Sequence, residues 1–196
     1  MKTLSCPPIP ISDETKIHVI LFIANKLIKS DISPDIYKIL KIIYFAEEEH
    51  LKITGRTICD DIFIAMKDGP VPSKTYDIIK SVKRDADIYS IEGLEKYFYF
   101  KNPYYIIPNI EADLSKLSES NICALKKSIA ENNRLTFSEL KRKSHDEAYN
   151  NADERNNTIS YKSMAKVAGA KEEMLNYIDV CSENDDFALF VSGSNK

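Results

Sequence analysis

The stretch that decides the fold is residues 33–55, SPDIYKILKIIYFAEEEHLKITG. It opens on Ser33 and Pro34, a helix-capping residue followed by a proline at the first helical position, where the missing N–H costs nothing. Apolar residues then recur at the spacing of one helix face: Ile36, Ile39, Leu40, Ile43 and Ala46. Gly55 stands where a glycine commonly ends a helix. We therefore expect this stretch to form a helix with a buried inner face.

The segments on both sides of this helix carry their own signals. Before it, Ser12 can cap a helix over residues 12–28, whose apolar stripe is wide enough for deep burial. After it, residues 62–66 form a short apolar run, which indicates a buried strand or connector. Residues 68–72 contain two prolines and predict a rigid turn that continues neither neighbour, and residues 73–82 predict another helix.

Aromatic residues gather around a turn in residues 97–107. Two runs, YFYF at 97–100 and YYII at 104–107, flank Lys101-Asn102-Pro103. Aromatic and β-branched residues on both sides of such a turn are typical of a β-hairpin. Pro108 then closes the second strand.

The C-terminal third is predicted to be helical, because three cap residues each stand beside a hydrophobic staple: Ser118, Thr136 and Ser160. Ser144 also matches the capping-box spacing and predicts a second short helix after the one that Thr136 begins. Gly169 is expected to separate the Ser160 helix from a final one. The predicted fold class is therefore predominantly α-helical (α+β), a compact helical domain with a small antiparallel sheet or hairpin.

The charge balance limits the kinds of partner. Lys and Arg number 27 against 30 Asp and Glu, so the formal charge is -3. A protein that binds nucleic acid chiefly through phosphates needs a clustered surplus of basic residues. The balance suits a protein-binding module better, and nucleic acid is not the expected partner.

The basic residues between 126 and 143 leave one alternative open. Six of them fall in the predicted capped helices: Lys126, Lys127, Arg134, Lys141, Arg142 and Lys143. Short helices joined by tight turns can form a helix-turn-helix DNA reader, here residues 118–152. Acidic residues interleave with the basic ones, which favours a solvated helix face. A DNA-binding transcriptional regulator stays the alternative function.

The cysteines and the termini give no sign of secretion. The cysteines are far apart and show no metal-binding spacing, so we expect them to be reduced: Cys6, Cys59, Cys123 and Cys181. The N-terminus lacks the apolar centre of a signal peptide, and the longest apolar run is far shorter than a membrane span. We expect a cytoplasmic chain with no membrane segment. A hydrolase built on Cys59 or Cys181 with His145 is a distant alternative.

Motifs for catalysis or cofactor binding are missing from the sequence. The three histidines, His18, His50 and His145, have none of the spacings of a metal site. We interpret His18 as a core residue, His50 as part of a solvated helix face behind residues 47–49, and His145 as a helix-start residue that bonds nearby backbone. The five glycines are isolated and build no phosphate-binding loop. The expectation is no enzyme, no cofactor and no metal.

Two stretches resemble a known family. Residues 38–46, KILKIIYFA, lead to a His-Leu pair at His50, and residues 63–72, FIAMKDGPVP, lead to Tyr76. The first is similar to the K-L-x-K-L-L-Y-Y-A helix of the Panacea domain, found in SocA-like antitoxins and many phage-associated proteins. The second resembles the A-W-x-x-G-P-V turn of the same domain and the tyrosine that follows it.

A third match is weaker. Residues 137–140, followed by Ser144-His145 and Tyr149, are similar to the family's L-S-x-x-T-H segment and the aromatic residue after it. Met66 and Tyr149 stand where the family usually has Trp, and this chain has no Trp. The resemblance therefore describes a remote member.

The resemblance implies a mostly helical domain that binds and neutralises a protein toxin encoded nearby, without catalysis. The SocA-like case also suggests an adaptor that delivers the toxin to a Clp-type protease. The Panacea-like domain would span residues 12–152, between an N-terminal lead (1–11) and a C-terminal helical segment (153–183) with a polar tail (184–196). A homo-oligomer is left open.

Two sets of residues are candidates for partner contact. The family-motif residues, in a structural or partner-contact role, are Tyr44, His50, Gly69, Pro70, Val71, Tyr76 and His145. In the Gly-Pro-Val turn we expect a structural role first, with the glycine at an unusual backbone angle and the proline stiffening the turn. The predicted hairpin adds four candidate interface anchors: Tyr97, Tyr99, Tyr104 and Tyr105. The alternative is that these aromatic rings only cover the core.

Overall fold

The computed structural model describes residues 11–83 and 93–193. Eight α-helices and five strands lie in these ranges: α1 (Ile11–Lys29), α2 (Ile36–Thr54), β1 (Phe63–Met66), β2 (Gly69–Pro72), α3 (Ser73–Lys83), β3 (Phe98–Asn102), β4 (Tyr105–Pro108), α4 (Glu119–Asn132), α5 (Phe137–Ser144), α6 (Glu147–Asn150), β5 (Thr158–Ile159), α7 (Tyr161–Val167) and α8 (Glu172–Gly193). The fold is predominantly helical with two small antiparallel sheets, as predicted. The N-terminal lead, except Ile11, and Cys6 lie outside the described residues.

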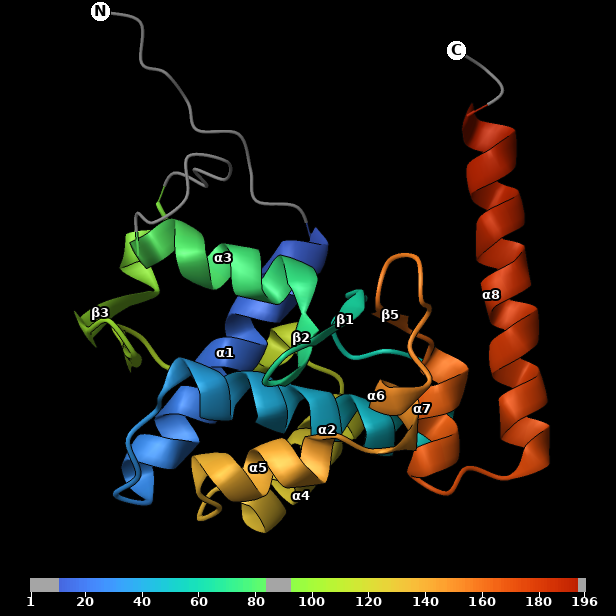
Figure 1. The fold of residues 1–196 in the computed structure, drawn as a ribbon. Helices are drawn as coiled ribbons and strands as arrows, with labels where there is room; N and C mark the ends of the chain where they lie inside the picture. The colour runs from blue at the N-terminus through green and yellow to red at the C-terminus, as the bar shows by residue number, and fades with distance from the viewer. Residues whose placement is uncertain (1–10, 84–92, 194–196) are drawn as a thin grey trace, which may run out of the picture.

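Helix α2 lies at the centre of the molecule. Figure 1 shows α4 and α5 below it and α3 and part of α1 above it. It contacts α1, α4, α5, α7 and the strand β2. Its buried apolar residues therefore exceed the predicted single stripe: Ile39, Leu40, Ile42, Ile43, Tyr44, Phe45, Ala46 and Leu51. Burial on nearly every side explains why this stretch decides the fold.

The start of α2 corrects the predicted cap. The helix begins at Ile36, and Asp35 is the N-cap, whose side chain accepts a hydrogen bond from Lys38 N at 2.8 Å. Pro34 lies outside the helix because its carbonyl accepts from Ile106 N in β4. Pairing with the hairpin therefore keeps residues 33 and 34 extended. The predicted end is confirmed, since Gly55 has φ 66° and donates to Leu51 O.

The three-stranded sheet corrects the predicted turn at residues 68–72. Strand order is β2-β1-β5, and β2 pairs antiparallel with β1, with Ile64 opposite Val71. Ser73 N donates to Ile62 O. Because hydrogen-bonded and non-hydrogen-bonded pairs alternate along an antiparallel ladder, the backbone of Pro70 and of Pro72 faces the edge of β2 that pairs with no other strand. Proline is tolerated in a strand at such an edge, because no ladder donor is needed there.

The burial expected for residues 62–66 is found at Phe63 only. Phe63 is fully buried, whereas Ile62 and Met66 are exposed. Side chains alternate between the two faces of a strand, so a continuous apolar run on a small sheet leaves half of its members outside. The run therefore gives the molecule an exposed apolar residue, Met66, next to the β1–β2 turn.

The predicted hairpin is confirmed. Strands β3 and β4 pair antiparallel, with Tyr99 opposite Ile107 and a register shift between Phe100 and Asn102. At the tip, Asn102 Oδ1 accepts hydrogen bonds from the backbone of Tyr104 and Tyr105. This turn fixes the direction in which Tyr104 leaves the hairpin.

The C-terminal helices follow most of the predicted signals. Ser118, Thr136 and Ser160 are N-caps, and Thr136 forms a capping box with Glu139. Ser144 is instead the last residue of α5, where its hydroxyl donates to Lys141 O. The acceptor that caps α6 is the carboxylate of Asp146.

Three helix boundaries remain. Helix α1 begins at Ile11, so Ser12 lies inside it and does not cap it. Gly169, with φ 86°, separates α7 from α8 as predicted. Helix α8 continues to Gly193, so residues 184–193 are helical, in contrast to the predicted tail. None of the helices in the described ranges is long and apolar enough to cross a membrane.

Candidate functional site

A groove of about 670 Å³ joins three of the predicted motif residues to one of the predicted interface aromatics. Its walls come from the start of α2, the β1–β2 hairpin, α3 and the tip of the β3–β4 hairpin. The predicted residues that line it are Gly69, Val71, Tyr76 and Tyr104. The fold thus brings together residues that the sequence pattern only named separately.

The backbone of Gly69 has the unusual angle expected for it. Its φ is 101°, a conformation that residues with a Cβ rarely adopt. A Cβ built on Gly69 would lie 2.5 Å from Ser144 Oγ and 3.0 Å from Lys41 Nζ. Both the backbone angle and the space around it therefore require glycine. The Gly-Pro-Val segment packs directly on α2 and α5 through this residue.

Lys41 forms part of the groove, although the sequence assigned it no role. Only 1% of its surface is exposed, and its Nζ donates to Pro70 O at 2.7 Å and lies 4.9 Å from the centre of the Tyr37 ring. Burial lowers the pKa of Lys41 to about 7, against the opposing attraction of Asp68. The charge of this ammonium group is therefore sensitive to any anion that comes near it.

The β1–β2 turn is held in place from several helices. Tyr37 OH donates to Asp68 O at 3.0 Å, and Lys141 Nζ lies 2.7 Å from Asp68 Oδ1. From α6, Tyr149 OH donates to Met66 O at 2.9 Å. These bonds fix the wall of the groove that carries the Gly-Pro-Val segment.

Exposed apolar side chains surround the groove. Met66 is 46% exposed and Tyr104 is 68% exposed. Phe137, at the start of α5, is 52% exposed, and its ring centre lies 4.3 Å from that of Tyr37. Large exposed apolar residues beside a hollow are a usual feature of protein-binding surfaces.

The four hairpin tyrosines do not act as one group. Tyr104 lines the groove, and Tyr99 is exposed on β3 outside the groove lining. Tyr97 is partly buried against His18, with ring centres 5.9 Å apart, and Tyr105 pairs with the backbone of Asp35. Tyr97 therefore covers the core, as the alternative predicted, and a role as interface anchor stays a prediction for the exposed Tyr99 and Tyr104.

Tyr44 belongs to a buried polar cluster behind the groove. Its hydroxyl donates to Asp146 Oδ2 at 2.9 Å, and burial raises the pKa of Tyr44. Glu48 lies next to this pair, and its Oε1 has no hydrogen-bond partner within the described part of the chain. Burial, together with the charge of Asp146, raises the pKa of Glu48 well above its usual range. The cluster links α2 to the cap of α6.

His50 corrects the predicted solvated face. It is buried, with Nδ1 2.6 Å from Arg56 O and Nε2 3.0 Å from Ser120 Oγ. Glu47 beside it is also buried, and its carboxylate accepts from the backbone N–H groups of Ile58 and Cys59, each at 2.8 Å. The loop after α2 folds back and supplies these donors, so Glu47 is not left in water. Burial raises the pKa of Glu47 to about 7.

The other two histidines follow their predictions in part: His18 is a buried core residue, and His145 bonds a backbone group. His18 is buried, and its Nδ1 accepts from Asp113 N at 3.1 Å. His145 Nδ1 lies 2.6 Å from Lys141 O, although His145 ends α5 and does not start a helix. Its ring packs on Tyr149, with centres 4.1 Å apart.

The basic residues of α4 and α5 are mostly exposed and lie among acids. Lys127 Nζ is 2.7 Å from Glu49 Oε2, and Lys143 Nζ is 3.9 Å from Glu131 Oε2. Such pairing agrees with the predicted solvated face. The DNA-binding alternative stays a prediction.

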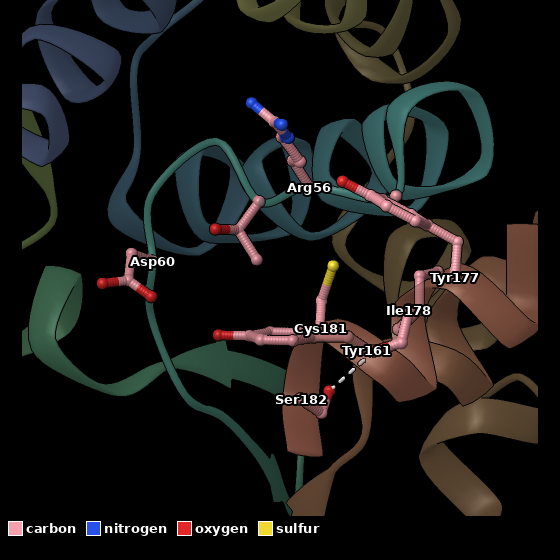
Figure 2. A pocket seen from close by; sticks show the side chains of 9 residues that line it. Arg56, Asp60, Tyr161, Tyr177, Ile178, Cys181 and Ser182 are labelled. Carbon is pink, nitrogen blue, oxygen red and sulfur yellow. Dashed lines mark hydrogen bonds between the residues drawn. The ribbon is translucent and has the colours of Figure 1, made fainter. Parts of the chain in front are cut away.

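A second hollow, of about 460 Å³, lies between α8 and the loop after α2. Figure 2 shows Arg56, Asp60, Tyr161, Tyr177 and Cys181 around it. A Cβ on Gly55 would lie 2.5 Å from the Tyr177 ring, so α8 packs directly on the end of α2. None of the predicted motif residues lines this hollow, among those that the structure describes.

The two cysteines of the hydrolase alternative lie in different surroundings, and neither is placed beside His145 by a contact among the described residues. Cys59 is buried, and burial together with the charges of Glu47 and Asp61 raises the pKa of its thiol, which disfavours the thiolate. Cys181 lines the second hollow, and His145 is not one of the described residues there. Within residues 11–83 and 93–193 there is also no group of three or more His, Cys, Asp or Glu side chains that could hold a metal ion.

Comparison with known proteins identifies the domain. A family model described as "Antitoxin SocA-like, Panacea domain" matches residues 39–150. Searches of curated proteins and of solved structures gave no match. The matched range includes the lysine, the Gly-Pro-Val segment and the α5–α6 residues around the groove, and it covers more than half of the chain. The chain therefore belongs to the SocA-like antitoxin family that carries the Panacea domain.

Proposed function

We propose that this protein neutralises a toxin by direct contact and that the toxin docks in the groove beside Gly69 and Tyr104. Membership of the family implies an antitoxin role and, in general, a toxin as the partner. The observation that supports the groove is the meeting of motif residues with exposed aromatic side chains on one hollow surface. In this proposal the protein acts by covering its partner, without catalysis.

The composition of the groove favours a protein partner. Exposed aromatic and Met side chains act as anchors in interfaces, because they bury a large apolar area with few rotatable bonds. Tyr104 lines the groove from a hairpin tip, Met66 lines it from β1, and Phe137 on α5 packs against Tyr37 of the lining. An elongated segment of a partner can contact Tyr104 and Met66 while it fills the hollow between them.

Co-expression tests the neutralisation. The small gene next to the gene of this protein is expressed with and without it, and growth is followed. We expect growth arrest that this protein relieves. Equal arrest in both cultures contradicts the proposal.

A matched pair of variants tests the groove. Tyr104→Ala removes an exposed ring that lines it, and Tyr99→Ala removes an exposed ring from the same hairpin outside the lining. Tyr104 is 68% exposed and Tyr99 47% exposed, so neither change should lower the melting temperature by more than a few degrees. We expect Tyr104→Ala to lose relief of growth arrest and Tyr99→Ala to retain it. The reverse result places the contact elsewhere.

Delivery of the toxin to a Clp-type protease is a finer proposal that rests on the family resemblance. It predicts that the toxin disappears faster when this protein is present, and only in cells that contain the protease. A toxin half-life that does not depend on the protease leaves neutralisation by contact alone.

Size-exclusion chromatography of the free protein decides whether it forms a homo-oligomer.

A further inference from the structure

The cations of the groove point to one property of the segment that it binds. Lys41 lies at its floor and Lys67 at its mouth, and both belong to the lining. Among the described residues of the lining, the one carboxylate is that of Asp68, and it forms an ion pair with Lys141 at 2.7 Å. Lys67, together with Lys41 whenever it is protonated, therefore leaves a positive surplus in a hollow that is otherwise apolar and aromatic.

Among the described residues, Lys41 has its hydrogen bond and its ring contact with uncharged groups, and Asp68, which attracts its ammonium group, forms its ion pair with Lys141 instead. Its Nζ donates to a backbone carbonyl, that of Pro70, and lies over the ring of Tyr37. A buried ammonium group without a carboxylate partner is costly, because its loss of water is not offset by an opposite charge. An anion that enters the groove can supply that charge.

We propose that the groove recognises an acidic side chain of the protein partner, with the carboxylate between Lys67 and Lys41 and a neighbouring apolar or aromatic side chain against Tyr37 and Tyr104. This inference rests on the proposed function and adds the chemistry of the segment that is bound. The carboxylate replaces water at Lys67 and draws the ammonium of Lys41 towards the groove. Its apolar neighbour fills the hollow between the two rings.

Proton uptake is a consequence that a merely structural lysine would not have. The titratable and charged groups that face Nζ are Tyr37 on α2, Asp68 in the β1–β2 turn and Lys141 on α5. Burial holds the pKa of Lys41 at about 7, and a bound carboxylate raises it. At pH 7.5 binding should therefore take up roughly three quarters of a proton.

Selection from a peptide library tests the chemistry. Random dodecapeptides displayed on phage are selected against the full chain and against three variants: Lys41→Met, Lys67→Ser and, as a control outside the groove, Lys101→Ser. We expect the full chain and the Lys101→Ser control to enrich peptides with Asp or Glu next to an apolar residue. The two groove variants should lose the acidic preference at least tenfold. Enrichment without acidic residues, the same preference on the groove variants, or no enrichment at all overturns the inference.

Calorimetry gives the second readout. An enriched peptide is titrated into the full chain at pH 7.5 in HEPES and in Tris, whose ionisation enthalpies differ. The expected difference in heat corresponds to proton uptake, and it disappears in Lys41→Met. Equal heats in the two buffers contradict the role of Lys41.

The co-expression test separates this inference from the proposed function. If Lys41→Met and Lys67→Ser relieve growth arrest as well as the unmodified chain does, the carboxylate contact is wrong and neutralisation stands. If the unmodified chain gives no relief, the proposed function fails, and the peptide selections still decide what the groove binds.

Discussion

Replacing Lys41 by Met should stabilise the protein at low pH and lose this advantage at high pH. The pKa of Lys41 falls from 10.5 in the unfolded chain to about 7 in the fold, because the ammonium group is buried. One pKa unit corresponds to ~1.4 kcal/mol, so holding the charged form inside costs about 4 to 5 kcal/mol at pH 6. Met keeps the length of the side chain and removes the charge.

The loss of one hydrogen bond opposes this gain. Pro70 O accepts from Lys41 Nζ, and a buried carbonyl left without a donor costs about 1 to 3 kcal/mol. We therefore expect Lys41→Met to unfold with a free energy roughly 2 to 3 kcal/mol higher than the unmodified chain at pH 6. A gain at that pH would show that the lysine is kept for a purpose other than stability.

The pH dependence gives the sharper test. A base whose pKa is depressed contributes full stability above its unfolded pKa of 10.5, and this contribution is lost as the pH falls towards about 7. The advantage of Lys41→Met should therefore shrink by about 3 kcal/mol between pH 6 and pH 9.5. Tyr37 does not interfere, because burial raises its pKa to about 12.

Urea unfolding of both chains across this range measures the difference directly. Lys67→Met is the matched control, since it removes an exposed lysine from the same turn. A difference for Lys41→Met that does not change with pH would falsify the reasoning, because it would mean that Lys41 keeps its ordinary pKa in the fold.

Three further changes probe the surroundings of the groove. Gly69→Val should destabilise the fold by about 3 kcal/mol or more, because φ is 101° and the new Cβ would meet Ser144 Oγ. Thermal melting measures this loss. An unchanged melting temperature together with lost binding would favour a contact role for Gly69. Tyr44→Phe should cost about 1 kcal/mol in urea unfolding through loss of the bond to Asp146, and no cost would mean that the hydroxyl finds water equally well in the variant. The pKa of Glu47 is raised to about 7, so its protonated form contributes stability below pH 4.5 that is lost as the pH rises through 7. Glu47→Gln should remove about 3 kcal/mol of this pH dependence between pH 4.5 and 8 in urea unfolding. Identical pH profiles of the two chains would contradict the raised pKa.

Local signals predicted the helices well because their causes are local. A cap such as Ser118 or Thr136 bonds a backbone N–H three residues later, so the sequence contains both partners. Gly55 ends α2 for the same kind of reason. The error at Ser144 is of a different kind, since Asp146 two residues on supplies a competing acceptor that a spacing rule does not weigh.

Errors concentrate where the decisive partner is distant in the chain. Strand β2 was predicted as a turn because it holds two prolines, and only its place at the edge of the sheet makes them acceptable. The burial of His50 depends on Ser120, and that of Glu47 on residues of a loop that folds back. No periodicity within α2 contains that information.

The candidate site divides in the same way. Gly69, Tyr76 and Tyr104 were predicted from family motifs and aromatic content, and the fold joined them. Lys41 was missed, although its place between Leu40 and Ile42 in an apolar helix is a signal, because such a lysine must either reach solvent or be buried with a partner. The hydrogen-bond acceptor of Lys41 is the backbone carbonyl of Pro70, and the apolar pattern of α2 contains no information about that contact.

The way in which the β1–β2 turn is held bears on how tightly the groove can bind. Lys41 bonds Pro70, Tyr37 and Lys141 bond Asp68, and Tyr149 bonds Met66. A wall fixed from three helices loses little conformational entropy when a partner arrives, so more of the contact energy is retained as affinity. The Gly-Pro-Val segment can therefore matter for binding without touching the partner, because its glycine lets the wall close on α2 and α5. Structural and contact roles of this motif are two consequences of one packing arrangement.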